Sequence, residues 1–263
     1  MSWDERQRGM LAAMGLRVWA AVPAPAPVAE CDADADAAPA AAAIERPTSR
    51  PVAAAVVGAL IEPSERAQAI ARMDWSALQA SVAACRACAL CEGRKQTVFG
   101  AGSPSAGWMV VGEAPGAQED LQGEPFVGES GQLLDKMLRA LGLGRDETVP
   151  AAQVYIANTL KCRPPRNRNP EAAELAQCEP YLNRQIALVQ PRIILAMGRF
   201  AVQSLLRSKE PVGKLRGRVH AYQGVPLIVT YHPAYLLRSP ADKAGAWADL
   251  CLARDTWQAQ AGG

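Results

Sequence analysis

Short apolar runs alternate with longer amphipathic segments through most of the chain, and this alternation limits the choice of fold. Apolar runs of strand length lie at residues 108–112, 154–157, 192–197 and 225–230. Helical spacing of apolar residues follows at 130–141, 170–189, 198–206 and 240–257. Strands separated by helices predict an α/β fold with a central, mostly parallel four-stranded sheet flanked by helices on both faces.

Polar residues follow three of the four predicted strands. Glu113 follows the first strand in a turn rich in glycine and proline, Asn158 follows the second, and His232 follows the fourth. Ligands of such sheets bind beyond the carboxyl ends of the strands. The sequence therefore places a carboxylate, an amide and an imidazole on one rim. The second of the two histidines, His220, lies in a basic loop and is interpreted as structural.

Four of the seven cysteines have spacings that suggest a shared site. Cys85 and Cys88 form a C-x-x-C pair, whereas Cys162 and Cys178 are separated by a proline-rich loop and the start of a helix. Four thiolates suit a soft metal or an iron–sulfur cluster. A zinc ribbon usually repeats the tight C-x-x-C pair, so the wide second pair favours an iron–sulfur cluster. The alternative is four unrelated reduced cysteines.

The chain divides into three predicted parts. Residues 1–20 have the spacing of a short amphipathic helix, and residues 21–63 are Ala/Pro-rich, which predicts a flexible linker. Cys31 lies in this linker and is not counted as a ligand. Residues 64–260 form the predicted folded domain, which opens with a helix over residues 64–84 capped by Ser64.

The cysteine content and the N-terminus indicate a reducing compartment. The number of cysteines is odd, and Arg17 interrupts the only apolar stretch that resembles an export signal. No apolar run is long enough to cross a membrane. We therefore expect a cytoplasmic protein.

The net charge of +2 is unevenly distributed, because the first 80 residues are acidic and the remainder is basic. Basic residues crowd two loops rich in Gly, Pro or Asn: Lys161, Arg163, Arg166 and Arg168 in one, and Lys214, Arg216 and Arg218 in the other. Such loops neutralise phosphates in nucleic-acid-binding proteins. The alternative is that they are ordinary solvated loops.

An ordered series of motifs resembles the family-4 uracil-DNA glycosylases over roughly residues 78–257. The motifs are Cys85-x-x-Cys88, Gly112-Glu113-Ala114-Pro115-Gly116, Gly123-x-Pro125-Phe126-Val127-Gly128, Asn158-x-x-Lys161-Cys162-Arg163-Pro164-Pro165 and Tyr231-His232-Pro233-Ala234-Tyr235-Leu236-Leu237-Arg238. The resemblance implies the uracil-DNA glycosylase fold, hydrolysis of the bond between uracil and deoxyribose in DNA, and initiation of base excision repair. It also implies a 4Fe–4S cluster on Cys85, Cys88, Cys162 and Cys178, with Cys91 as an extra thiol. We expect a monomer.

The base must leave the duplex to be reached, and the resemblance suggests how it is then read. Asn158 offers a donor and an acceptor that complement the O4/N3 edge of uracil, whereas cytosine shows the opposite pattern. Phe126 is the expected stacking platform; the alternative is a core aromatic. Glu119 is expected to exclude the thymine methyl group; the alternative is a solvated charge at a helix start. Backbone N–H groups from Ala114 to Gly116 are expected to contact the base or a phosphate.

Bond cleavage places negative charge on the uracil, and His232 is the expected donor to its O2 atom. Glu113 is the expected acceptor for the attacking water. Its alternative roles are to stabilise the sugar cation or to shape its loop.

Contacts with DNA are expected from three groups of residues. Leu236 and Leu237 are candidates to wedge into the minor groove, and Arg238 to hold a phosphate; the alternative is that this run packs a helix start. The cluster is expected to be structural and to hold the basic loop, with Lys161, Arg163, Arg166 and Arg168, against DNA.

Other functions remain open at this point. One is a relative that traps uracil covalently, although the loop at 161–170 lacks the histidine found in such relatives. Others are a non-catalytic DNA-binding or redox-sensing module and a glycosylase of broader specificity. Residues 1–20 with their tether are a candidate docking peptide for a repair or replication protein; the alternative is a dispensable tail.

Overall fold

The computed structural model describes residues 64–261 of the chain. These residues cover the predicted folded domain. The predicted helix at 1–20, the predicted linker at 21–63 and the docking role suggested for them lie outside the described residues.

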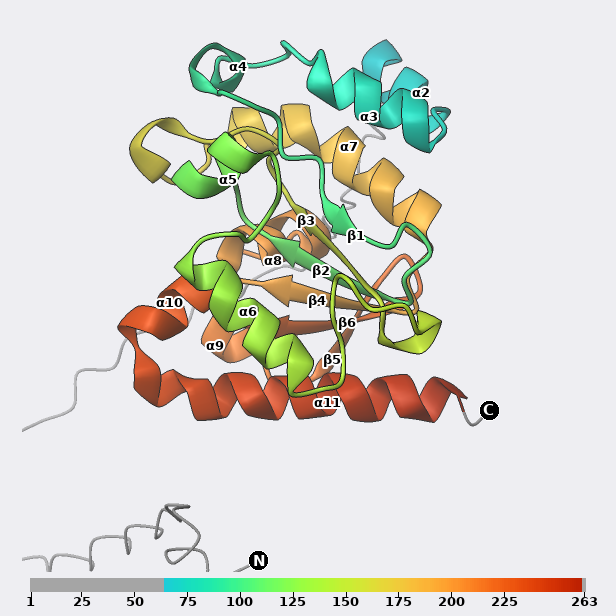
Figure 1. Cartoon of the computed structure of the whole chain (residues 1–263), viewed down its shortest axis with the longest axis vertical. Coiled ribbons are helices and arrows are strands. Elements are labelled where there is room, and N and C mark those ends of the chain that lie inside the picture. Colours follow the sequence, from blue (N-terminus) through green and yellow to red (C-terminus); the bar gives the residue numbers. More distant parts are fainter. Residues whose placement is uncertain (1–63, 262–263) are drawn as a thin grey trace, which may run out of the picture. The chain divides into compact units, whose positions relative to one another are not determined.

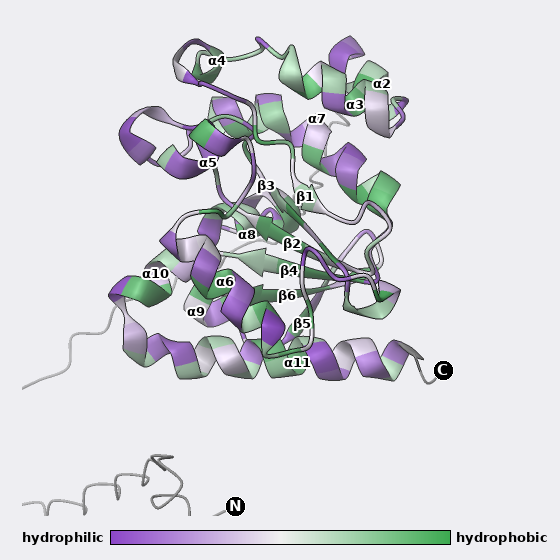
Figure 2. Ribbon diagram, viewed as in Figure 1, coloured by the Kyte–Doolittle hydropathy of each residue, from purple (hydrophilic) through white to green (hydrophobic). Residues whose placement is uncertain are grey.

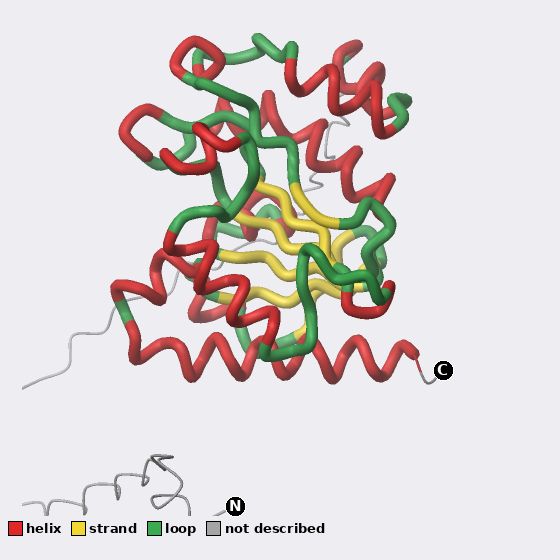
Figure 3. Tube along the Cα trace, in the orientation of Figure 1, coloured by secondary structure: helices red, strands yellow, loops and turns green. Residues whose placement is uncertain are grey.

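A six-stranded sheet forms the centre of the domain (Figures 1 and 3). Its strands are β1 (Ala101–Gly102), β2 (Trp108–Gly112), β3 (Val154–Asn158), β4 (Ile193–Met197), β5 (Val219–Tyr222) and β6 (Val225–Thr230), in the order β1-β3-β2-β4-β6-β5. The four predicted strands pair in parallel, and β1 and β5 add antiparallel edges. The predicted α/β fold is confirmed, and the sheet is wider than predicted by these two edge strands.

Burial explains why the four central strands could be predicted from the sequence. Every residue of β2, β3 and β4 is buried, as expected for parallel strands covered on both faces. In β5, exposed and half-buried residues alternate, and β1 has only two residues. Neither edge strand therefore carries an apolar run.

Helices cover both faces of the sheet, and successive residues of β2 show this. Met109 and Val111 pack into a cluster with α7 (Ala172–Val189) and α8 (Arg199–Leu206). Trp108 and Val110 pack on the other face with Leu134 and Leu138 of α6 (Glu129–Arg139) and Leu250 of α11 (Lys243–Ala261). Figure 2 shows the apolar colour in the central strands and mixed colours along α6 and α11. The sheet is therefore a rigid support whose strand ends can carry a site.

The helix predicted over residues 64–84 is two helices, α2 (Glu65–Ala71) and α3 (Trp75–Ala83). It begins as predicted, with the Ser64 hydroxyl accepting a hydrogen bond from the Ala67 N–H at 3.2 Å. The Asp74 carboxylate caps the second helix by accepting from the Ala77 N–H at 2.8 Å. An internal cap residue therefore divides the predicted helix.

Short helices make up the remaining connections. They are α4 (Leu90–Gly93), α5 (Ala117–Gln122), α9 (Val212–Leu215), α10 (Pro233–Arg238) and the 3₁₀ turns at Pro150–Ala152, Pro165–Asn167 and Pro240–Asp242. None of the helices within residues 64–261 combines the length and the apolarity that crossing a membrane requires.

Candidate active site

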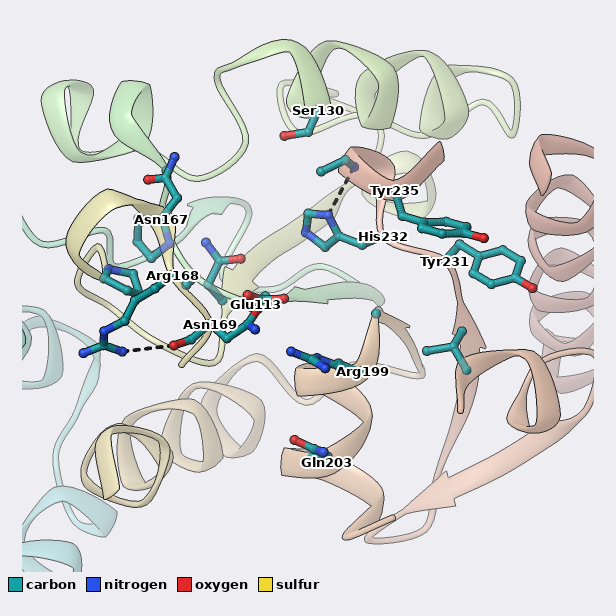
Figure 4. A pocket seen from close by; sticks show the side chains of 18 of the residues that line it. Glu113, Ser130, Asn167, Arg168, Asn169, Arg199, Gln203, Tyr231, His232 and Tyr235 are labelled. Atoms are coloured by element: carbon teal, nitrogen blue, oxygen red, sulfur yellow. Dashed lines mark hydrogen bonds between the residues drawn. The ribbon is translucent and has the colours of Figure 1, made fainter. Parts of the chain in front are cut away.

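A cavity of about 960 Å³ opens at the carboxyl ends of the parallel strands (Figure 4). Glu113 reaches it from the end of β2, Asn158 from β3, Arg199 from the first position of α8 after β4, and His232 from the end of β6. The pairing of Gly112 with Asn158 and of Met197 with Thr230 aligns these strand ends. The convergence predicted from the sequence is therefore present.

Asn158 brings a buried polar atom without a partner to this cavity. Its side chain is 2% exposed, and its Oδ1 atom makes no hydrogen bond to any part of residues 64–261. Leaving a buried acceptor unpaired costs about 1–3 kcal/mol, so native proteins rarely do so without a ligand. A Cβ on Gly112 would lie 2.5 Å from this oxygen and 2.6 Å from the Phe126 ring, so glycine is required there.

His232 lies beside Phe126, with ring centroids 5.5 Å apart and planes 30° apart. Burial, with Arg238 adding to it, lowers the pKa of His232 to about 4. The Nδ1 atom accepts a hydrogen bond from the Ala234 N–H at 3.2 Å. The imidazole is therefore neutral near pH 7 and carries its proton on Nε2.

Phe126 is held in a left-handed backbone conformation, with φ of 55°. Arg145 donates to the carbonyl oxygens of Pro125 and Phe126, at 2.8 and 3.1 Å, and forms a 2.9 Å ion pair with Asp135. A Cβ on Gly131 would lie 1.8 Å from the Phe126 carbonyl oxygen. These contacts fix the loop and hold the ring at the cavity.

The Glu113 carboxylate lines the cavity near Arg199 (Figure 4). Burial raises the pKa of Glu113, and the positive charge of Arg199 opposes this rise. Among the described residues, no donor makes a hydrogen bond to this carboxylate, so its oxygens are available to a ligand or water.

Glu119 lines the same cavity but its carboxylate is already engaged. Its oxygens accept hydrogen bonds from the N–H groups of Gly116, Val127 and Gly128, each at 3.0 Å. The side chain therefore clamps the turn after β2 to the loop that carries Phe126. Ala114, on that turn, also lines the cavity.

The structure contradicts the prediction of DNA contact for Lys161. Lys161 is 1% exposed, and its Nζ atom donates to the Asn158 carbonyl oxygen at 2.8 Å and to Gln185 Oε1 at 2.6 Å. Its ammonium group therefore turns into the core and supports the end of β3.

The wedge prediction is also wrong for Leu236, which is 1% exposed, whereas Leu237 is 42% exposed. The two residues are adjacent on α10, and adjacent helical positions point in different directions. Arg238 and Arg168 line the cavity, and the Arg168 guanidinium is paired with Glu174 at 2.6 Å. Arg166 is exposed, and half-buried Arg163 donates to Asn167 at 2.7 Å.

The four predicted cluster cysteines line one small pocket, together with Cys91. N–H donors point at three of their sulfur atoms: Arg94 at Cys162 (3.1 Å), the Lys161 backbone at Cys178 (3.3 Å) and Arg66 at Cys85 (3.6 Å). Burial raises the pKa of Cys178 to about 12. Within residues 64–261, no three His, Cys, Asp or Glu residues converge closely enough to hold a single metal ion.

Sequence comparison assigns the family. The family model of the Uracil DNA glycosylase superfamily matches residues 99–251. The chain belongs to this superfamily. It is 42% identical over 190 residues to a type-4 uracil-DNA glycosylase of Pyrobaculum aerophilum, covering 68% of this chain and 93% of that protein. It is 42% identical over 165 residues to the type-4 enzyme of Saccharolobus solfataricus, covering 59% and 74%.

A second type of uracil-DNA glycosylase matches the chain at lower identity. A type-5 uracil-DNA glycosylase of Pyrobaculum aerophilum is 36% identical over 146 residues, covering 51% of this chain and 64% of that protein. The type-4 relatives match at higher identity than this type-5 enzyme, which confirms the resemblance to the type-4 family inferred from the motifs.

Several cavity residues of this superfamily member were not predicted. Arg199 follows Gly198 at the end of β4, and Tyr231 and Tyr235 flank His232. The strand-end rule, applied to the third predicted strand, would have indicated Arg199. Tyr231 and Tyr235 belong to one of the motifs, but nothing in the sequence distinguishes them from aromatic residues of the core.

Proposed function

We propose that this chain flips uracil out of DNA and hydrolyses its N-glycosidic bond, which initiates base excision repair. The chain is a DNA glycosylase by family. The choice of base rests on the unpaired, buried Oδ1 atom of Asn158, which lines the same cavity as the neutral imidazole of His232.

Asn158 reads the base in this proposal. Its Oδ1 atom accepts the N3–H of uracil, and its amide nitrogen donates to O4. Cytosine lacks the N3 proton and presents a donor in place of O4, so it leaves the buried oxygen unpaired. Phe126 offers its ring face to the flipped base.

His232 supplies the charge stabilisation. As the bond to deoxyribose breaks, negative charge grows on the uracil, and the Nε2–H group donates to O2. A neutral donor fixed in place by Ala234 strengthens its hydrogen bond as this charge develops.

Glu113 positions the attacking water. Its carboxylate is free of protein donors within residues 64–261, and Arg199 favours the ionised form that accepts a proton or hydrogen bond. Glu119 acts one step away: it clamps the two loops that form the wall expected to exclude the thymine methyl group, together with Ala114.

Cys85, Cys88, Cys162 and Cys178 hold a 4Fe–4S cluster in this proposal. The donor set fits, because four sulfur ligands surround one pocket and N–H groups point at three of them. In a four-iron cluster each cysteine binds a different iron atom, so convergence on a single point is not required. The bound cluster supplies a cross-link between segments rather than a reacting centre.

In this proposal the DNA strand is held by basic residues near the cavity and by one apolar side chain. Arg163, Arg166 and Arg238 are placed to meet phosphates, with Arg168 held by Glu174 beside them. Leu237 is the exposed apolar side chain on α10 that is able to enter the space left by the flipped nucleotide.

The test is an end-labelled oligonucleotide with a single uracil, with matched thymine and cytosine controls and a chelator present. We expect alkali-labile sites at uracil alone, with more product than enzyme. Protein fixed covalently to DNA would instead identify a trapping mechanism, and no product from brown, cluster-loaded protein would refute the proposal.

Asn158→Ala tests the base reader directly. It should lower kcat/KM on uracil by about 100-fold or more, by analogy with removal of a preorganised hydrogen-bonding group. Asn183→Ala is the matched control, because Asn183 bonds Tyr222 outside the cavity and should leave activity unchanged.

A further inference from the structure

Tyr235 exposes an aromatic ring beside the site of base reading. It lines the cavity and is 37% exposed, whereas the next residue, Leu236, is buried. At about 960 Å³ the cavity lies at the upper end of the range for drug-sized ligands, which is far more than one pyrimidine fills. Other groups of the substrate must therefore occupy part of it.

The ring of Tyr235 is fixed rather than free. It packs on Tyr231, with ring centroids 5.1 Å apart and planes 31° apart. Its hydroxyl group donates to Asp242 Oδ2 at 2.7 Å. A ring held at both its face and its hydroxyl loses little rotamer freedom when a second planar group stacks on it.

The packing beneath this ring extends into the core. The Arg216 guanidinium lies over the Tyr231 ring, 5.3 Å from its centroid. Arg216 in turn forms a 3.0 Å ion pair with Asp249, which is 0% exposed and also accepts from the Gly217 N–H at 3.1 Å. The series Asp249, Arg216, Tyr231, Tyr235 thus runs from a buried anion to an exposed ring at the cavity.

The charged residues that line the cavity indicate which group stacks on Tyr235. Arg199, Lys209 and Arg238 line the same cavity, together with the carboxylates of Glu113, Glu119 and Glu210, and they offer cationic contacts to the phosphates of a DNA strand. When a DNA strand inserts one nucleotide into the cavity, the nucleotides on either side of it must lie along the cavity rim. Every nucleobase has a flat π-face that stacks on an aromatic side chain, whatever its sequence.

We propose that Tyr235 stacks on the nucleobase adjacent to the flipped uracil and so forms a flanking-base subsite. This inference rests on the proposed function and deepens it. The subsite accepts any base and stabilises the strand while the uracil is out of the stack.

The test is a thermodynamic cycle between protein and substrate. Single-stranded oligonucleotides carry uracil with a normal base on both sides, or with an abasic analogue on the 5′ or the 3′ side. We measure kcat/KM for the wild type and for Tyr235→Ala. Removing the base on one side should lower wild-type kcat/KM by about 5- to 100-fold. Tyr235→Ala should cause a similar loss on normal DNA and no further loss on that abasic substrate.

Two further variants separate stacking from general damage. Tyr235→Phe keeps the ring and should keep most of the flanking-base effect. Trp247→Ala removes an aromatic side chain of similar exposure, 44%, that does not line the cavity, so this variant should respond to the abasic substrates as the wild type does.

Additive losses in the cycle, or an indifference of the wild type to the neighbouring bases, would overturn the subsite while uracil excision persists. Absence of uracil excision by the wild type on every substrate would instead refute the proposed function.

Discussion

The strand-end cavity and the thiol pocket are built on opposite principles. In the strand-end cavity, buried strands present two groups that accept no hydrogen bond from residues 64–261. These groups are Asn158 Oδ1 and the Glu113 carboxylate. In the thiol pocket, loops and helices that do not belong to the sheet bring sulfur atoms together, and N–H donors already point at most of them. The first arrangement leaves room for a substrate to complete the bonding; the second suits a permanent cross-link.

A short segment joins the two regions. Lys161 donates from its side chain to the Asn158 carbonyl and from its backbone to Cys178. Thr159 and Leu160, between them, both donate to the Glu113 carbonyl. Four consecutive residues, 158–161, therefore connect the proposed base reader, the backbone of Glu113 and the thiol pocket. The contrast between the pockets can thus be tested by measuring stability and turnover separately.

The largest effect is expected in the thiol pocket, on stability. Cys178→Ser should remove the brown colour and lower the free energy of unfolding by about 4 kcal/mol or more, the range seen when a structural metal site is lost. Denaturant titration and visible absorbance measure both. Cys91→Ser is the control, because Cys91 lines the same pocket but is not a proposed ligand.

If Cys178→Ser abolished turnover while the unfolding midpoint and DNA binding stayed at wild-type values, the cross-link interpretation of the cluster would be wrong.

The next effect is expected in the cavity, on turnover. His232→Ala should lower kcat by about 100- to 1,000-fold, because the donor to the developing negative charge is lost. The melting temperature should fall by only a few degrees, because the His232 ring also caps α10 by accepting from the Ala234 N–H. His220→Ala, which removes the ring that contacts the Leu215 carbonyl at 2.7 Å, should leave kcat near the wild-type value. Equal losses of kcat in the two variants would contradict the assignment.

The connecting segment should respond in both measurements. Lys161→Met leaves the Asn158 carbonyl and Gln185 Oε1 without their donor, which should lower the free energy of unfolding by about 1–3 kcal/mol. Displacement of Asn158 should also lower kcat/KM about 10- to 100-fold. Lys136→Met, on the exposed side of α6, is the matched control. A loss of stability without a loss of activity would show that the two pockets are independent.

The smallest effect is expected in the pH profile. Arg199 opposes the burial that raises the pKa of Glu113, so Arg199→Ala should raise this pKa further. Because the ionised carboxylate is the active form in the proposed mechanism, the acid limb of kcat/KM should move to higher pH, and Arg199→Lys should move it back. An acid limb that does not respond to either substitution would exclude Glu113 as the titrating group.

The sequence predicted the main features of the cavity because they follow from one rule. Apolar runs reveal buried parallel strands, and the carboxyl ends of such strands meet at one rim. Glu113, Asn158 and His232 could therefore be brought together without a structure. Their roles in the reaction remain predictions.

Other features depend on side-chain direction, which composition does not encode. Lys161 belongs to a basic loop by sequence, but a buried glutamine and a carbonyl oxygen draw its ammonium group inward. Leu236 and Leu237 are alike in sequence and differ only in their phase on α10. Strands β1 and β5 were not predicted, because edge strands need few apolar residues and these two contain no apolar run.

The edge strand β1 also affects how readily neighbouring molecules of the protein can associate. An open sheet edge offers unpaired backbone groups that a neighbouring molecule is able to extend, which leads to aggregation. Here β1 contributes only two residues, one of them Gly102 with φ of 99°. So short and irregular a margin is a poor template for strand addition, and this edge therefore gives neighbouring molecules little opportunity to join their sheets.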